Sequence, residues 1–115
     1  MKKNFSIPKG EKLLVSEKGR KRFIEIEKIT HITCEGHIST IHTIDKNKIH
    51  TYKLLKEYEN ELKELRFIRT NNNSLCNLSN ISEYRKKGSK HILIMVDDSE
   101  VEISKRKLPN IRKVL

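Results

Sequence analysis

The chain has 115 residues, of which 35% are hydrophobic and 35% are charged. This length is that of one domain, which can bury a modest single core but not a core together with a deep catalytic cleft. Lys and Arg number 25 against 15 Asp and Glu, so the net charge is +10 at neutral pH. Such an excess of positive charge repels itself in the compact state, so a protein that carries it usually has an anionic partner, of which nucleic acid is the commonest. Since no apolar run could span a membrane and no signal peptide is visible, we expect a cytoplasmic protein without a membrane partner.

The charges are distributed unevenly along the chain. Between Leu65 and Ile92 the only acidic residue is Glu83, and none follows Ser104. The basic residues in these two stretches are Arg66, Arg69, Arg85, Lys86, Lys87, Lys90, Lys105, Arg106, Lys107, Arg112 and Lys113. The C-terminal half is therefore predicted to carry a basic surface that suits a polyanion.

The first structural elements are predicted to be a short tail and a hairpin. The first ten residues end in Pro8-Lys9-Gly10, which resists regular structure, so we expect a tail or linker over residues 1–11 and a domain over residues 12–115. Lys12–Val15 is a short apolar run. Arg22–Glu27 alternates Ile with Glu, which is the period of a half-buried strand. The Gly-containing turn between these two runs predicts a β-hairpin.

The middle of the chain is predicted to form three further strands and a helix. Residues 29–44 are rich in Ile and Thr and are interrupted by Glu35-Gly36, which favours two strands joined by a turn. After a second turn, residues 49–52 form another strand. Apolar residues then recur at helical spacing, and they are Leu54, Leu55, Tyr58, Leu62 and Leu65. At the start of this helix Thr51 could serve as the N-cap, whereas Lys53 would be a poor one.

The C-terminal half is predicted to contain a polar loop and more strands. Thr70–Ser74 is five polar residues in a row, three of them Asn, which favours a loop. Residues 81–87 and 91–96 form a hairpin around Gly88, and a last strand contains Val101 and Ile103. Residues 108–115 could form a short amphipathic helix. The total of about eight strands and one clear helix predicts a mostly β fold.

Residue patterns typical of catalysis or metal binding are not found. The five histidines lack the spacing of a zinc motif, and His37 and His42 would point to opposite faces of an extended segment. Cys34 and Cys76 have apolar neighbours, which predicts inert, reduced thiols rather than nucleophiles. The four glycines form no phosphate-binding loop. We therefore expect no enzymatic activity, metal, cofactor or small-molecule substrate.

Asn and basic residues form the pattern that most resembles a binding site. Asn71–Asn73 lie in the predicted loop just after Arg69, and Lys105-Arg106-Lys107 follows the last strand. In a DNA major groove an Asn amide can pair with adenine and an Arg guanidinium with guanine. Neighbouring lysines would hold the phosphate backbone. This pattern alone also fits a solvated loop and a solvated chain end.

The order of these pieces resembles the LytTR family of bacterial DNA-binding domains, the output domains of response regulators in two-component systems. The similarity covers nearly the whole chain from about Lys12 onward. Five pieces in order carry it: Phe23–Ile32, Cys34–His37 with Thr40–His42, the helical run Leu54–Leu62, Phe67–Leu78 with Ile81, and Val101–Arg106.

The resemblance implies an elongated arrangement of short antiparallel β-sheets with one short amphipathic helix between them. It also implies double-stranded DNA as the partner, read by loops in the major groove, in a transcription regulator. The residues expected to contact bases are His37, Ser39, Asn72 and Arg106. The residues expected to contact the DNA backbone or support the loops are Arg69, Asn71, Asn73, Lys87, Lys105 and Lys107. Asn77 matches an asparagine of the family motif and is expected to be structural.

The preferred DNA sequence, the class of partner and the oligomeric state stay open at this point. The family commonly has His-Arg or His-Lys where this sequence has Asn71-Asn72, so the preferred DNA sequence is expected to differ from that of better-known relatives. An RNA-binding basic β module is the main alternative, although the chain has only six Phe and Tyr residues and no Trp for base stacking. An adaptor for an acidic protein would leave the Asn loop unexplained. On repeated DNA sites a homodimer is possible.

Overall fold

The computed structural model describes residues 9–115, and these form ten strands, two α-helices and three single 3-10 turns. The strands are β1 (Lys12–Glu17), β2 (Arg20–Glu25), β3 (Ile29–Glu35), β4 (Ile38–Thr43), β5 (Lys48–Thr51), β6 (Phe67–Asn71), β7 (Ser74–Asn77), β8 (Ile81–Lys87), β9 (Lys90–Met95) and β10 (Glu100–Ile103). The α-helices are α1 (Leu55–Leu62) and α2 (Leu108–Val114), and the 3-10 turns are Ile26–Lys28, Lys63–Leu65 and Leu78–Asn80.

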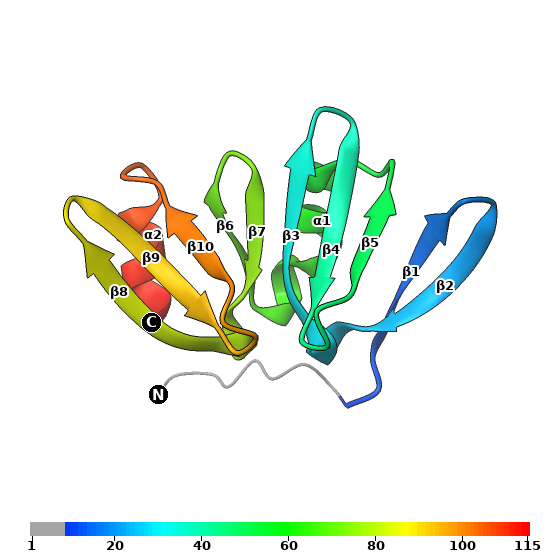
Figure 1. Cartoon of the computed structure of the whole chain (residues 1–115), viewed down its shortest axis with the longest axis horizontal. Coiled ribbons are helices and arrows are strands. Elements are labelled where there is room, and N and C mark those ends of the chain that lie inside the picture. Colours follow the sequence, from blue (N-terminus) through cyan, green and yellow to red (C-terminus); the bar gives the residue numbers. More distant parts are fainter. Residues whose placement is uncertain (1–8) are drawn as a thin grey trace.

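The strands form three separate antiparallel sheets that stand side by side (Figure 1). The β1–β2 hairpin lies at one end, a five-stranded sheet of order β5-β4-β3-β7-β6 lies in the middle, and a three-stranded sheet of order β10-β9-β8 lies at the other end. The molecule measures 43 × 35 × 24 Å along its principal axes. The predicted fold class is confirmed, with α2 as a second short helix.

The first hairpin shows why its residues form strands. Burial alternates along β1, where Leu13 and Val15 are buried and their neighbours are exposed. Ile24 is buried on the same face from β2. The expected strand over Arg22–Glu27 is shifted, because Ile26–Lys28 makes a 3-10 turn in which Ile26 enters the core. The strand signal was right, but its last two residues belong to the turn that leads into β3.

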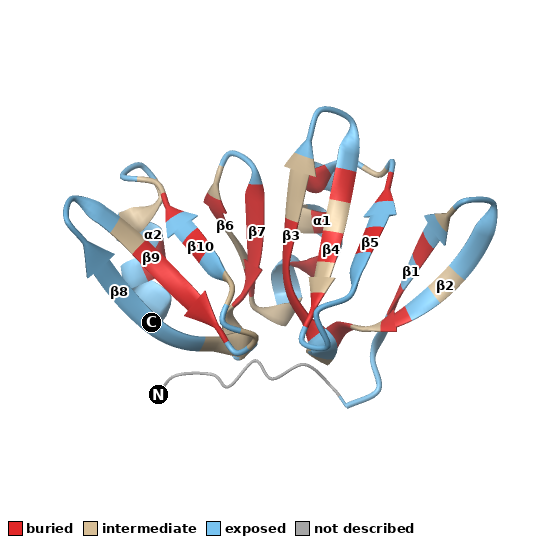
Figure 2. Cartoon of the chain, in the orientation of Figure 1, coloured by how far each residue is buried: buried red, intermediate tan, exposed pale blue. Residues whose placement is uncertain are grey.

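The larger core lies between the central sheet and α1, which covers one face of that sheet (Figures 1 and 2). Leu55, Tyr58 and Leu62 of α1 are buried as predicted. The helix begins after Leu54, whose N–H donates to the Glu57 carboxylate at 3.3 Å. This Glu supplies the negative charge that a helix N-terminus favours. Thr51 is not the cap, since its hydroxyl is hydrogen-bonded to the Tyr58 hydroxyl at 2.7 Å.

A smaller core lies between the three-stranded sheet and α2. Its buried members are Cys76, Leu93, Met95, Val101, Ile103 and Ile111. Pro109 fits the first turn of α2, where its missing N–H would have no helical partner. Cys76 is fully buried and burial raises the pKa of its thiol to about 12, as expected for an inert thiol, whereas Cys34 is only partly buried.

The predicted loop over Thr70–Ser74 is mostly strand. β6 continues through Asn71 and β7 begins at Ser74, so only Asn72 and Asn73 form the turn. Thr70 is fully buried, and its hydroxyl donates to the Ser74 carbonyl at 3.3 Å. Polarity alone indicated a loop, but small hydroxyl residues can be buried in a sheet when their polar atoms are hydrogen-bonded.

The predicted tail over residues 1–11 falls largely outside the described part of the chain, which begins at Lys9. Within that part, Lys9 and Gly10 form a turn and Gly10 has a φ of +86°. The Glu11 carbonyl accepts a hydrogen bond from the Ile26 N–H at 2.9 Å. Glu11 is thus already attached to the domain.

Candidate nucleic-acid interface

Three connections lie along one edge of the molecule, at the top of Figure 1. They are the β3–β4 turn at Gly36-His37, the β6–β7 turn at Asn72-Asn73 and the β10–α2 connection over residues 104–107. We call them loops 1, 2 and 3. Gly36 has a φ of +60°, a conformation that favours glycine, so the Glu35-Gly36 signal in the sequence marks a real turn. All three segments that the sequence singled out thus reach the same edge.

Loop 2 is joined by a backbone hydrogen bond to β3, the strand that leads into loop 1. The Cys34 N–H, at the end of β3, donates to the Asn73 carbonyl at 3.0 Å. The Asn73 N–H in turn donates to the Asn71 side-chain oxygen at 2.8 Å, which closes the turn locally. Loop 2 is therefore fixed both within itself and against the strand that carries loop 1.

Loop 2 and loop 3 are joined across the boundary between two sheets. The Asn71 amide donates to the Glu102 carbonyl at 2.7 Å, and the Ser104 N–H donates to the Thr70 carbonyl at 2.9 Å. A surface groove of about 550 Å³ lies between the two loops and is lined by Asn71, Asn72, Asn73, Glu102, Ser104 and Arg106. These bonds give the two loops a common, fixed frame.

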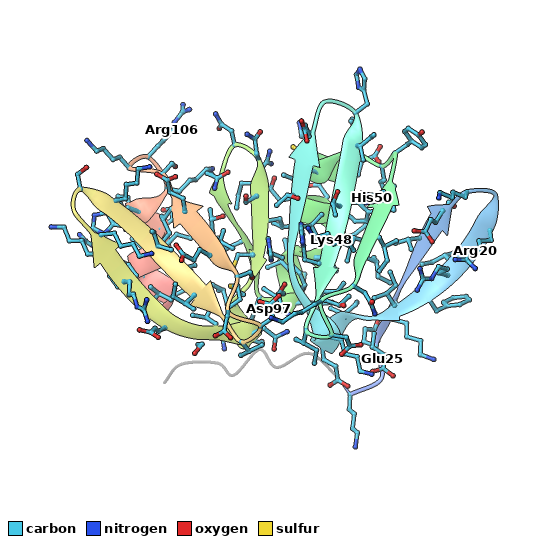
Figure 3. All side chains as sticks on the ribbon, in the orientation of Figure 1. Arg20, Glu25, Lys48, His50, Asp97 and Arg106 are labelled. Atoms are coloured by element: carbon cyan, nitrogen blue, oxygen red, sulfur yellow. The ribbon has the colours of Figure 1, made fainter. Side chains whose placement is uncertain are left out.

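The side chains best placed to meet a ligand are those at the loop tips. His37, Asn72 and Arg106 are exposed, one on each loop, and Lys105 is exposed beside Arg106. Arg106 lies at the rim and points away from the sheets (Figure 3). The edge therefore offers an imidazole, an amide and a guanidinium, which are hydrogen-bonding groups able to recognise base edges.

Ser39 does not belong to this set. It was expected to contact a base, but only 1% of it is exposed, and its hydroxyl donates to the Lys53 carbonyl at 2.6 Å. In β4 it lies on the same face as Ile41, which is part of the core. Ser39 instead ties β4 to the segment that leads into α1.

Comparison with known proteins identifies the family. The model of the LytTr DNA-binding domain matches residues 19–115, which is most of the chain. The chain belongs to the LytTR family. Its domain is of the kind that binds DNA in response-regulator transcription regulators.

A solved structure has the same fold. It is described as the LytTr DNA-binding domain of a methyl-accepting/DNA response regulator from Bacillus cereus. The two chains share 16% sequence identity and superpose with a TM-score of 0.77, over 90% of this chain and 94% of that one. Curated protein sequences contain no significant match. No helix within residues 9–115 of this LytTR domain is long and apolar enough to cross a membrane.

The predicted supporting residues of the LytTR domain are mostly engaged within the protein. Asn71 and Asn73 hold loop 2 as described above. The Arg69 guanidinium contacts Glu59 and the carbonyls of Asn71 and Asn72. Lys87 lies at the end of β8 and pairs with Glu100 at 3.0 Å, and both side chains are half exposed. The Lys107 N–H donates to Ser104 at the start of α2.

The sequence reasoning missed the partners that build this edge. Glu59 on α1, the backbone N–H of Cys34 and the Glu102 carbonyl all hold a loop, yet none was singled out. Each lies 10 or more positions from its partner in the chain. Glu59 is 10 residues from Arg69, and Glu102 is 31 residues from Asn71. No local spacing pattern could have paired them.

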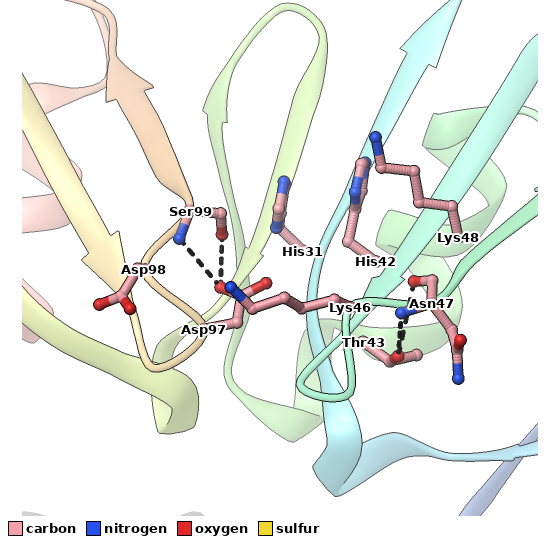
Figure 4. A pocket seen from close by; sticks show the side chains of 9 residues that line it. All are labelled: His31, His42, Thr43, Lys46, Asn47, Lys48, Asp97, Asp98 and Ser99. Atoms are coloured by element: carbon pink, nitrogen blue, oxygen red, sulfur yellow. Dashed lines mark hydrogen bonds between the residues drawn. The ribbon is translucent and has the colours of Figure 1, made fainter.

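The LytTR domain has one further cluster of titratable groups, away from the loop tips (Figure 4). His31 and His42 stack on the face of the central sheet that looks toward Asp97 in the β9–β10 turn. They line a pocket of about 410 Å³ together with Thr43, Lys46, Asn47, Lys48, Asp98 and Ser99. Within residues 9–115, no group of three or more His, Cys, Asp or Glu side chains is arranged to hold a metal ion.

Proposed function

We propose that residues 12–115 form a sequence-specific DNA-binding domain that places loops 1, 2 and 3 in the major groove of double-stranded DNA. The observation that carries the proposal is that three separate loops, each with an exposed hydrogen-bonding side chain, share one edge and are held there by hydrogen bonds that involve the loops and the strands beside them. Such a preformed edge limits the conformational entropy that binding must remove. The chain would act as a transcription regulator on chromosomal DNA in the cytoplasm.

The exposed side chains have distinct roles in this proposal. Arg106 would donate two hydrogen bonds to a guanine, and Asn72 would pair through its amide with an adenine. His37 would contact a base through its imidazole. Lys105 and Lys107 flank Arg106 and would meet phosphates, which fix the register of the protein on the duplex.

Lys87 would provide a further phosphate contact at the outer end of the interface. Its present partner is Glu100, and an exposed ion pair of this kind contributes only about 0–1 kcal/mol. A phosphate can therefore compete for the Lys87 ammonium at little cost. Arg69, Asn71 and Asn73 would act from behind, as supports of loop 2.

The RNA-binding alternative is less well supported. Single-stranded RNA is usually bound by aromatic side chains that stack on successive bases. The exposed Phe and Tyr residues within residues 9–115 are Phe23, Tyr52 and Tyr84, and they belong to three different parts of the fold: β2, the connection between β5 and α1, and β8. They do not make one stacking surface.

Selection of bound duplexes from a random pool, followed by competition, tests the proposal. The selected duplex should be displaced by unlabelled copies of itself and far less well by RNA of the same sequence or by heparin. A pool that yields no preferred sequence, or equal competition by all three polyanions, would overturn sequence-specific DNA binding. The same duplex with one and with two copies of the selected site would show whether two chains bind together as a homodimer.

A further inference from the structure

The guanidinium of Arg69 is committed to three acceptors within the protein. Nε donates to the Asn71 carbonyl at 3.2 Å, Nη2 to the Asn72 carbonyl at 2.8 Å and Nη1 to the Glu59 carboxylate at 2.8 Å. Two of these acceptors belong to consecutive residues, Asn71 at the end of β6 and Asn72 in loop 2, and the third belongs to α1. A single planar group thus connects the helix behind the central sheet to the backbone of a DNA-reading loop.

This arrangement requires an arginine. The guanidinium presents its donors in a rigid planar fork, so one side chain can hold carbonyls in two directions and a carboxylate in a third. A lysine ammonium is a point charge and cannot reproduce that geometry. A β-bulge between Arg69 and Asn71 interrupts the register of β6 with β7 at this place, so the strand pairing alone does not define the loop.

Glu59 sets the electrostatic character of Arg69. The carboxylate and the guanidinium are both partly buried, with 35% and 22% of their side chains exposed. Their charges largely compensate each other, which leaves Arg69 with little free charge for a phosphate. Glu59 itself is held in place because α1 is anchored in the core by Leu55, Tyr58 and Leu62.

We propose that Glu59 and Arg69 are a positioning pair that sets DNA specificity without touching DNA. The pair fixes the backbone of Asn71 and Asn72, and this orients the Asn72 amide toward its base. The inference rests on the proposed function, because Asn72 must read a base for its orientation to matter. Arg69 is then a support of the reading residue, and Glu59, on a helix away from the loop tips, determines specificity at one base position.

The experiment compares variants on the selected duplex and on its single-base variants. Glu59→Ala and Arg69→Lys should lose discrimination at the same base position as Asn72→Ala, where a good base contact is worth about 10-fold or more. Discrimination at the other positions and the salt dependence of binding should stay at the parent's values. Glu64→Ala is the matched control, since it removes one carboxylate from an exposed position next to the same helix.

A second measurement needs no DNA. The Asn73 N–H is hydrogen-bonded inside loop 2, so its amide hydrogen exchange reports whether the loop is held. Glu59→Ala should speed this exchange severalfold, and Glu64→Ala should not change it. Glu59→Gln, which keeps an oxygen acceptor for Arg69, should restore both the exchange rate and the specificity profile in part.

Three results would overturn the inference. The first is a Glu59→Ala profile identical to that of Glu64→Ala. The second is an Arg69→Gln variant that weakens binding equally on every sequence and makes the log–log salt slope about 0.9 less steep, as expected for a lost phosphate contact. The third is an unchanged Asn73 exchange rate in Glu59→Ala. If the parent chain shows no sequence preference at all, the proposed function fails, and the exchange rate alone then decides whether the pair positions the loop.

Discussion

His31 and His42 stack face to face on adjacent strands, with ring centroids 4.1 Å apart and planes 4° apart. The two residues are direct cross-strand partners in β3 and β4. Each ring is also hydrogen-bonded to a threonine hydroxyl at 2.9 Å, His31 to Thr30 and His42 to Thr33. Two protonated rings at this separation would repel each other, so the arrangement favours neutral histidines.

The stacked pair predicts a loss of stability in mild acid. Burial, followed by the charge of His42, lowers the pKa of His31 from 6.5 to about 4. Burial also lowers the pKa of His42. For both histidines, the charge of Lys48 opposes protonation and the charge of Asp97 favours it. The unfolded chain therefore binds protons that the folded chain does not, and stability falls as the pH drops from about 6.5 toward about 4. At about pH 5 the loss due to His31 should be about 2 kcal/mol relative to neutral pH.

Urea denaturation of the parent and of His31→Gln at both pH values checks this prediction. The variant keeps a polar side chain but cannot gain a proton, so its stability should depend less on pH than that of the parent. Carboxylates that titrate in the same range affect both proteins alike. Equal pH dependence of parent and variant would show that His31 is not the group responsible.

Leu62→Ala should destabilise the domain strongly. Only 1% of Leu62 is exposed, and it fills the space between α1 and the central sheet. The cavity left behind should cost about 2–5 kcal/mol, a large share of the stability of a domain of this size. Lys56→Ala, on the exposed face of the same helix, is the control and should change the free energy of unfolding by less than about 0.5 kcal/mol. A Leu62→Ala variant that unfolds at the parent's urea concentration would mean that the helix packs differently.

Asn77 should contribute to the stability of the domain rather than to DNA binding. It is fully buried, its amide donates to the Ile29 carbonyl at 2.8 Å and its oxygen accepts from the Ser79 N–H at 3.0 Å. Asn77→Ala should lower the free energy of unfolding by about 1–3 kcal/mol. Asn77→Asp keeps the shape of the side chain but replaces the donor with a buried carboxylate that faces a carbonyl, so it should destabilise the domain more than Asn77→Ala does. Thermal unfolding at neutral pH measures both, with the exposed Asn60→Ala as reference. The reverse order of the two variants would contradict the assigned donor role.

Binding to DNA should depend steeply on salt. With about five or six phosphate contacts from this basic surface, a plot of log K against log salt concentration should have a slope of roughly −5, from about −0.9 per phosphate. Lys105→Ala should make the slope less negative by about 0.9, while Asn72→Ala should leave it unchanged because an amide releases no counterion. A slope near zero between low and moderate salt would contradict the electrostatic part of the proposal.

Local patterns were sufficient to predict most of the fold. The Leu55, Tyr58, Leu62 spacing indicated α1 and its buried face, and the Glu35-Gly36 and Gly88 signals marked turns that the structure contains. The alternation of side chains between the two faces of a strand also indicated the position of Ser39. Ser39 lies two residues before the buried Ile41 in β4, so strand periodicity already places it on the core face. The family resemblance outweighed that signal and led to an expected base contact for Ser39, whose side chain the structure buries.

The remainder could not be predicted because it depends on contacts between distant parts of the chain. Thr70 looks like a loop residue in sequence, but the Ser104 N–H and the Ser74 carbonyl supply the hydrogen bonds that allow its burial. Likewise, Arg69 and Arg106 are both arginines in the sequence, and their residue type does not distinguish their roles. Only the position of α1 reveals that Glu59 engages Arg69, whereas Arg106 is exposed.

The most direct test of the account is the base-by-base specificity of three variants on the selected duplex. Arg106→Ala and Asn72→Ala should each cost about 1–3 kcal/mol on the preferred site and relax the preference at one position, and the two positions should differ because the residues lie on separate loops. Lys87→Ala should weaken binding about equally on every sequence. The account is contradicted if Arg106→Ala and Lys87→Ala give the same specificity profile, because Arg106 would then be only a phosphate anchor.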